Sequence, residues 1–363
     1  MKIVLAFDSF KHCLRAHEVC SYVREGICHA VPFAEVLSFP LADGGEGTVD
    51  AACRIAGKTP VQIPVTGPLG EPRMAPVLLD NGLAVLEAAS ACGIEWVRPE
   101  DRDPMRTTTF GVGELLREIA ARGVRRCVVG LGGSATVDGG IGMLRALGTH
   151  FFDSSVHETH SLIEVAAMEL PSVFPEMEIL LASDVENPLC GPRGAAAVFG
   201  PQKGARPADI PVLDGALRRL LELFGAGDLP GDGAAGGLGF AFRMLGAKRT
   251  SGARWMLQYA GFAEALQGAD LVITGEGCSD GQTADGKLPW IVAEAAGCAG
   301  VPAVLLSGAL GNGYEVLESR FAALCSLSAG PGTLESALQS APEQLRRQGR
   351  NLANLLAAGP ARN

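Results

Sequence analysis

The fold is decided by the opening stretch of the chain, residues 1–48, which read MKIVLAFDSFKHCLRAHEVCSYVREGICHAVPFAEVLSFPLADGGEGT. Apolar runs over Lys2–Phe7 and Ala34–Pro40 predict two strands, and an amphipathic pattern over Ala16–Ala30 predicts a helix between them. A strand, a helix and a strand at this spacing are typical of a βαβ unit, whose two strands run parallel. The stretch therefore predicts an α/β fold built on a parallel sheet.

The same alternation continues to about residue 65 and returns near the end of the chain. It predicts a helix over Gly47–Gly57 and a strand over Pro60–Val65, then strands over Ala269–Thr274, Val301–Ser307 and Phe321–Leu327 and helices over Lys287–Gly297 and 333–357. Continuous apolar strands of this kind are typical of a parallel sheet that is buried on both faces.

The middle of the chain follows a different pattern. Asn81-Gly82 separates two apolar runs in LLDNGLAV, residues 78–85, and predicts an antiparallel hairpin. A hairpin inside a βαβ chain indicates an inserted domain. We therefore expect residues 1–65 and 265–363 to form one doubly wound parallel-sheet domain, and residues 66–264 to form a second α/β domain with a mixed sheet. The glycine-rich residues 225–239 are expected to form a loop that approaches something closely.

Composition narrows the classes of partner. The chain has 363 residues, 30 of them basic and 40 acidic, and no dense run of Lys or Arg. This balance disfavours nucleic acid and anionic membranes as partners. We find neither a signal segment nor an apolar run of about 18 residues, so we expect a cytoplasmic protein. The ten cysteines form no CxxC pair and are expected to be thiols in a reducing compartment.

Carboxylates and glycines follow four of the predicted strands. In chain order the acids are Asp8, Asp43, Glu46, Asp184, Glu276, Asp280 and Asp285. Ligands of an open α/β sheet bind beyond the carboxyl ends of its strands. A single Asp often caps a helix, and for Asp8-Ser9 capping is an equal alternative. Several acids beside Gly-Gly and Gly-x-Gly turns instead favour a magnesium ion carried with phosphate.

A glycine-rich loop at residues 130–140 reads GLGGSATVDGG and lies between a predicted strand, Arg126–Gly130, and a predicted helix, Asp138–Leu147. We expect Gly132, Gly133 and Ser134 to hold nucleotide phosphates through backbone N–H groups, while Thr136 and Asp138 cap the helix. The alternative is a tight turn that uses glycine for backbone reasons only.

Three further polar residues are candidates for the site. Thr108, in RTTTFGVGELL (106–116), could bind a small anion or act as an ordinary cap. Lys287 precedes a predicted helix, where a cation opposes the helix dipole and so indicates a nearby anion. Lys203, on the loop AVFGPQKGA (197–205), is interpreted as a solvated loop charge.

Eight stretches of the chain, taken in order, resemble the signature blocks of the type I glycerate kinase family. They are DSFK (8–11), PLADGGEGT (40–48), TGPLGEP (66–72), TTTFGVGEL (107–115), GLGGSATVDGG (130–140), DVENPLCGPRGAAAVFGPQKGA (184–205), GAAGGLGFAF (233–242) and LVITGEGCSDGQTADGK (271–287). The resemblance implies ATP-dependent phosphorylation of D-glycerate with Mg2+, at the 2-hydroxyl to give 2-phosphoglycerate. It also implies a flavodoxin-like domain interrupted by a second α/β domain, with the active site in the cleft between the two domains.

Within this resemblance we expect each candidate to have one role. Asp184 is expected to accept the hydroxyl proton, and Lys11 and Lys287 to neutralise the glycerate carboxylate or the transferring phosphate. The expected metal partners are Asp43 with Glu46 or Glu276, the expected substrate-binding residues are Asp8, Ser9, Thr108, Asn187 and Asp280, and the expected ATP-binding residues are Gly132, Gly133 and Ser134.

Two alternatives stay open at this point. Cys278 stands where the family usually has an arginine, and DSSVHETHSLIEVAA replaces a usual glycine-rich stretch near residues 153–165. These departures allow a kinase of another small hydroxy acid. A non-catalytic nucleotide- or metabolite-binding regulator on the same fold is the other alternative, against which the many charged candidates count. The expected partners are glycerate and ATP, and a homodimer is left open.

Overall fold

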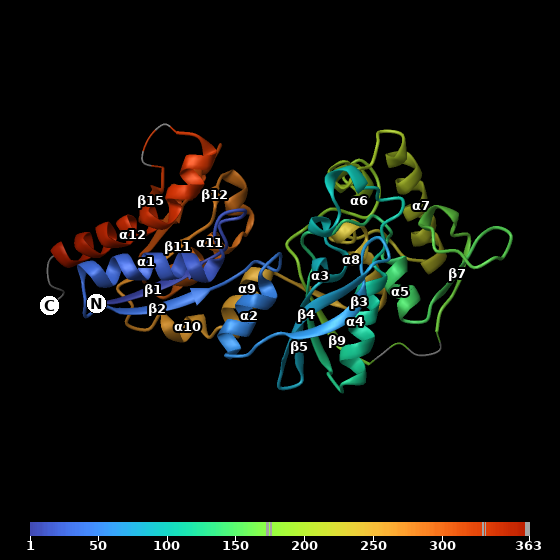
Figure 1. Cartoon of the computed structure of the whole chain (residues 1–363), viewed down its shortest axis with the longest axis horizontal. Helices are drawn as coiled ribbons and strands as arrows, with labels where there is room; N and C mark the ends of the chain where they lie inside the picture. Colours follow the sequence, from blue (N-terminus) through green and yellow to red (C-terminus); the bar gives the residue numbers. More distant parts are fainter. Residues whose placement is uncertain (172–173, 175, 329, 331, 360–363) are drawn as a thin grey trace. The chain divides into compact units, whose positions relative to one another are not determined.

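The computed structural model describes residues 1–171, 174, 176–328, 330 and 332–359, and the chain divides into two compact units (Figure 1). Unit 1 comprises Met1–Asp43, Asp50–Gly57 and Ala253–Asn363, and unit 2 comprises Gly44–Val49 and Lys58–Gly252. These divisions differ from the predicted ranges in three short segments, 44–49, 58–65 and 253–264. That each unit is an independently folding domain stays a prediction.

Unit 1 is built on a five-stranded sheet in which every strand pair is parallel. Across the sheet the order is β2 (Glu35–Pro40), β1 (Lys2–Phe7), β11 (Leu271–Gly275), β13 (Ala303–Ser307) and β15 (Ala323–Ser326). Numbered by their order in the chain, these strands run 2-1-3-4-5, which is the flavodoxin-like order. The predicted flavodoxin-like sheet is confirmed.

Helices cover both faces of this sheet. α1 (Ala16–Ala30) and α12 (Leu334–Ala358) pack together, as Figure 1 shows, and share a core with Ile3, Leu5 and Phe7. Alternate strand residues point to opposite faces, and the intervening Val4 and Ala6 are also fully buried. α11 (Leu288–Cys298) packs on β11 and β13. The remaining elements are α2 (Thr48–Ala56), α9 (Gly252–Tyr259), α10 (Phe262–Ala265), β12 (Cys278–Ser279) and β14 (Ala309–Leu310).

Unit 2 contains a mixed six-stranded sheet, as predicted. Its order is β10 (Lys248–Thr250), β9 (Glu178–Ala182), β6 (Arg126–Gly130), β5 (Leu83–Glu87), β4 (Pro72–Asp80) and β3 (Val61–Thr66). The first four strands are parallel, whereas β4 runs antiparallel to both of its neighbours. The predicted hairpin joins β4 to β5, and Asn81 and Gly82 have φ values of 48° and 79°, which fits the positive φ that a two-residue turn of this kind requires.

β3 differs from the sequence expectation. The strand forms where it was predicted, but it pairs with β4 in the sheet of unit 2 rather than joining the parallel sheet. A tight turn explains the pairing, because the Gly67 N–H donates to the carbonyl of Glu71 at 2.6 Å and returns the chain directly along β3.

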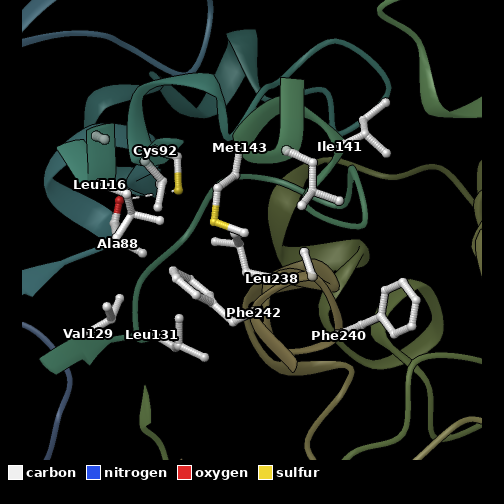
Figure 2. Close-up of a cluster of buried hydrophobic side chains, with 14 of the residues drawn as sticks. Ala88, Cys92, Leu116, Val129, Leu131, Ile141, Met143, Leu238, Phe240 and Phe242 are labelled. Carbon is white, nitrogen blue, oxygen red and sulfur yellow. Dashed lines mark hydrogen bonds between the residues drawn. The ribbon is translucent and has the colours of Figure 1, made fainter. Parts of the chain in front are cut away.

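The helices of unit 2 enclose a second apolar core. They are α3 (Ala89–Cys92), α4 (Phe110–Ala121), α5 (Ile141–Ala146), α6 (Ala195–Phe199), α7 (Asp209–Phe224) and α8 (Leu238–Met244), and a short hairpin pairs β7 (His150–Phe152) with β8 (Ala167–Glu169). Figure 2 shows Met143, Leu238 and Phe242 gathered in this core. No helix in the described ranges has both the length and the apolar character needed to cross a membrane.

The glycine-rich stretch 225–239 makes the predicted close approach. A Cβ added to Gly236 would lie 1.8 Å from the carbonyl oxygen of Thr136, and one added to Gly237 would lie 2.6 Å from the Cα of Gly139. Only glycine fits at such distances, so the backbone of this stretch packs directly against the loop at residues 130–140.

Candidate functional site

An acidic edge, Asp8, Asp43 and Glu276, lies at the carboxyl ends of the strands in unit 1. In a sheet of this order, ligands bind where the chain switches direction, between the first and third strands. Asp8 directly follows β1 and Glu276 directly follows β11, and the Asp8 N–H donates to the carbonyl of Gly275 at 3.2 Å. The topology therefore places two of the predicted acids at the position where this fold binds ligands.

Helix capping does not account for Asp8. Its Oδ1 accepts the N–H of the adjacent Ser9 at 2.6 Å, whereas α1 begins later, with Arg15 as its N-cap residue. Burial raises the pKa of Asp8 well above its ordinary value, and repulsion from Asp43 and Glu276 raises it further. Carboxylates that repel one another in this way favour a bound cation.

Hydroxyl groups hold Glu276 in one orientation. The hydroxyls of Ser279 and Thr283 both donate to its Oε1, at 3.0 and 2.8 Å, and Ser279 also bonds to Ser307 at 2.6 Å. Burial raises the pKa of Glu276, while Thr283 and the positive charge of Lys287 oppose the rise. The carboxylate is thus fixed by neutral donors.

Two lysines predicted to be catalytic belong to the same unit. Lys287 is the N-cap residue of α11, and its Nζ lies 3.6 Å from Oδ1 of Asp280. Lys11 is exposed in the turn after β1, and a Cβ on Gly277 would lie 3.4 Å from its backbone nitrogen. The structure therefore brings Asp280, Lys287 and Glu276 together, and it places Lys11 beside the chain that follows Glu276.

The second half of the predicted residues belongs to unit 2, where the turn Gly44–Val49 crosses strand ends. The Val49 N–H donates to Oε1 of Glu87, the last residue of β5, at 2.8 Å. A Cβ on Gly44 would lie 2.6 Å from the carbonyl of Ala182, at the end of β9. The turn carries Glu46, which is exposed, to the same sheet edge as Asp184, which follows β9.

Glu87 was missed in the sequence. A signal is present in the sequence, because Glu87 ends an apolar run in the same way as the candidate acids do. It lacks the adjacent glycines that drew attention to the others.

The glycine loop, residues 130–140, begins at the end of β6. A Cβ on Gly132 would lie 2.9 Å from the Cα of Gly45, so the loop packs against the Gly44–Val49 turn. Gly132 and Gly133 are exposed, and Gly133 has a φ of +75°. Among the described residues, the N–H groups of Gly132, Gly133 and Ser134 have no acceptor. Successive unpaired N–H groups of this kind suit an anion.

Lys203 corrects an interpretation made from the sequence. Its predicted role as a solvated loop charge is wrong, since the residue is only 4% exposed. Its ammonium donates to Ser134 Oγ at 2.9 Å and to the carbonyl of Thr136 at 2.7 Å. Burial lowers the pKa of Lys203 to about 8. The sequence could not reveal this, because a glycine-rich loop is usually exposed.

Asp138 connects the glycine loop to the threonine-rich segment. Its carboxylate accepts from the backbone and hydroxyl of Thr109, both at 2.8 Å, and from the N–H groups of Gly140 and Gly142 at the start of α5. The prediction that Asp138 caps the helix is wrong in its position, because the N-cap residue of α5 is Gly140, but the carboxylate does accept N–H groups at the start of that helix. Thr136 does not share these bonds, because its buried Oγ1 accepts no N–H of α5 within the described ranges.

Thr108 and Asn187 lie in turns of unit 2. The Thr108 hydroxyl accepts the N–H of Phe110 at 3.2 Å, so its local role is at the start of α4. The Asn187 side chain donates to the carbonyl of Arg193 at 2.8 Å, and its own carbonyl accepts from Gly231 and Gly233. Both residues are half-buried.

Comparison with known proteins decides the family. A sequence profile described as "Glycerate kinase family" matches residues 3–357. The chain belongs to the glycerate kinase family. Glycerate kinase of Bacillus cereus is 38% identical over 97% of each chain, and glycerate 2-kinase of Escherichia coli is 38% identical over 99% of each. A crystal structure described as a "putative glycerate kinase 2" from Salmonella typhimurium LT2 has a TM-score of 0.86, with 40% identity and 99% coverage of both chains.

Membership of the glycerate kinase family makes the protein a kinase and confirms the resemblance seen in the sequence. It does not assign individual roles to the candidate residues. Half of those residues belong to each unit: Asp8, Ser9, Lys11, Asp43, Glu276, Asp280 and Lys287 to unit 1, and Glu46, Thr108, Gly132, Gly133, Ser134, Asp184 and Asn187 to unit 2.

Proposed function

We propose that the protein phosphorylates the 2-hydroxyl of D-glycerate with ATP and Mg2+, giving 2-phosphoglycerate and ADP. The proposal rests on two groups of residues at strand ends in a chain of the glycerate kinase family. Unit 1 has the acidic edge, and unit 2 has the glycine loop, in which successive backbone N–H groups lack an acceptor among the described residues. Phosphoryl transfer needs these two kinds of group, since it depends on charge neutralisation and on positioning of phosphates.

The acidic edge fits magnesium better than a softer metal. Its charged side chains, Asp8, Asp43 and Glu276, are carboxylates, which supply the oxygen ligands that magnesium takes. Magnesium typically takes one or two protein carboxylates together with substrate phosphates. We assign Asp43 with Glu276 or Glu46 to hold it. When bound, the ion would neutralise the charge that develops on the phosphate oxygens.

The chain's own residues are assigned the remaining steps. Asp184 accepts the proton of the 2-hydroxyl of glycerate. The hydroxyl oxygen then bonds to the γ-phosphorus of ATP, while the bond between that phosphorus and the leaving oxygen of ADP breaks. Lys11 and Lys287 neutralise the glycerate carboxylate or the transferring phosphate, and Asp8, Ser9, Thr108, Asn187 and Asp280 orient the substrate. The N–H groups of Gly132, Gly133 and Ser134 hold nucleotide phosphates. The ten free thiols fit a reducing compartment such as the cytoplasm.

The function is tested by ADP release from ATP and magnesium with D-glycerate, L-glycerate, glycolate or tartronate, against a blank without acid. We expect ADP release to exceed that of the blank only when D-glycerate is present. Cys278 favours another acid as substrate, because its side chain is exposed near Asp280 and Glu276 at the position where the family resemblance has an arginine. Release with another acid and not with D-glycerate would establish that second candidate, and release with none would refute both.

A further inference from the structure

The buried ammonium of Lys203 has no described function in the reaction. It comes from the turn after α6, and the turn is fixed: the Lys203 N–H donates to the carbonyl of Gly200 at 3.0 Å, and a Cβ on Gly204 would lie 2.1 Å from the carbonyl of Arg102. The side chain is therefore delivered to one place, beneath the glycine loop.

This ammonium is costly to bury where it lies. Among the described residues, no carboxylate forms an ion pair with it, and its two acceptors are the neutral oxygens of Ser134 and Thr136. Removing an ammonium from water without an opposite charge in contact is unfavourable. A neutral side chain could fill the same space with a smaller free-energy cost of burial. The presence of a charged side chain therefore indicates that the charge has a function.

The bonds that Lys203 makes suggest the task. An ammonium only donates, so its bond occupies a lone pair of Ser134 Oγ and leaves the hydroxyl hydrogen for another acceptor. Its second bond fixes the carbonyl of Thr136, two residues along the loop. Backbone bonds from Ile94 to Gly133 and from Ala135 to Cys92 hold the other side of the loop, at 2.8 and 2.7 Å.

We propose that Lys203 is a positioning residue that shapes the glycine loop for a nucleotide phosphate and turns the Ser134 hydroxyl into a donor toward it. The proposal rests on the proposed function, since it takes the loop to be the phosphate site. Lys203 acts through Ser134 and the loop backbone.

The titration of Lys203 gives this role a distinctive signature. Two titratable groups face the ammonium: Cys92, whose thiol pKa burial raises to about 12, and Asp138, which accepts four hydrogen bonds. Burial also raises the pKa of Asp138, while its hydrogen bonds from Thr109, Gly140 and Gly142 oppose the rise. Because Lys203→Arg keeps both neighbours but does not lose its own charge, that variant isolates the titration of Lys203. Negative phosphate nearby would raise the pKa of Lys203, and nucleotide binding just above pH 8 would therefore take up a proton.

The test measures the dissociation constant of ADP with magnesium by calorimetry, from about pH 6.5 to about pH 9.5. The proteins are the full-length wild type, Lys203→Arg, Lys203→Met and the control Lys248→Met, in which an exposed lysine of unit 2 is removed. We expect wild-type affinity to fall about five- to tenfold above pH 8, with proton uptake, because a charged donor is stronger than a neutral one. Lys203→Arg should bind without this pH dependence. Lys203→Met should also lack the pH dependence and should bind about ten- to a hundredfold more weakly than the wild type below pH 8. Lys248→Met should match the wild type.

The outcomes separate the two proposals. A wild type that binds no nucleotide refutes the proposed function, and the role of Lys203 with it. A wild type that binds ADP, with folded Lys203→Met binding equally well, refutes only the role of Lys203. If Lys203→Met does not fold, Lys203→Arg decides alone, and a pH dependence like that of the wild type would overturn the proposal.

Discussion

Asp184 is the residue to which the proposed chemistry assigns the proton. It is exposed and lies two residues after the end of β9, and the next helix, α6, begins only after its N-cap residue Gly194. Helix capping therefore does not explain this acid. Its place at a strand end could be predicted from the sequence, because a buried apolar run and a following Asp are both local patterns.

Replacing Asp184 by Asn tests the assignment. The amide keeps the shape of the side chain but cannot accept the proton, so turnover with D-glycerate should fall about 10²- to 10⁴-fold. Binding of ADP should be nearly unchanged. Glu186→Gln is a matched control on the same segment, since Glu186 is exposed and pairs with Arg249 at 2.7 Å. Near wild-type turnover of the Asp184 variant in steady-state assays would remove Asp184 from the mechanism.

The burial of Lys203 could not be predicted from the residues that surround it in the sequence. The loop around it is rich in glycine and proline, a composition that predicts solvent exposure, yet the side chain is buried beneath a segment about seventy positions earlier in the chain. Only the packing of unit 2 brings these two segments together. The contact of Glu87 with the N–H of Val49 depends in the same way on a neighbour that is distant in sequence, 38 positions earlier in the chain.

At the scale of elements, most strands and helices could be predicted because their patterns are local. β1 and α1 have the predicted bounds, and the Asn81-Gly82 hairpin forms as expected. The sheet to which β3 belongs could not be predicted from its own residues, because its partner is chosen by the turn that follows it.

The packing of α1 on α12 depends on glycines, which gives an element-scale prediction. A Cβ on Gly26 would lie 2.0 Å from the backbone carbonyl of Arg346, so Gly26→Ala must push the helices apart. We expect the free energy of unfolding to fall by about 1–3 kcal/mol.

Gly215→Ala is the matched control for this prediction. Gly215 is exposed in α7, with nothing within 4 Å of the added Cβ. Alanine there should stabilise by about 1 kcal/mol through helix propensity alone. Urea unfolding of both variants measures the difference, and equal effects of the same sign would contradict the packing argument.

At the scale of the whole molecule, the fold and family follow from the order of many weak signals. Each glycine or acid motif is common by itself, but eight of them in sequence indicate one family, which the profile over residues 3–357 confirms. The two sheets could be predicted because continuous apolar strands and a hairpin are different patterns. That the candidate residues of both units act in one reaction is part of the proposed function.

The most direct test of the central claim is phosphorus NMR of the product formed from D-glycerate, ATP and magnesium by the full-length protein. Proton coupling distinguishes a phosphate on the secondary 2-oxygen, which couples to one proton, from one on the primary 3-oxygen, which couples to two. The account predicts a doublet from 2-phosphoglycerate that grows in step with ADP. A triplet from 3-phosphoglycerate, or ADP without any phosphorylated acid, would contradict it.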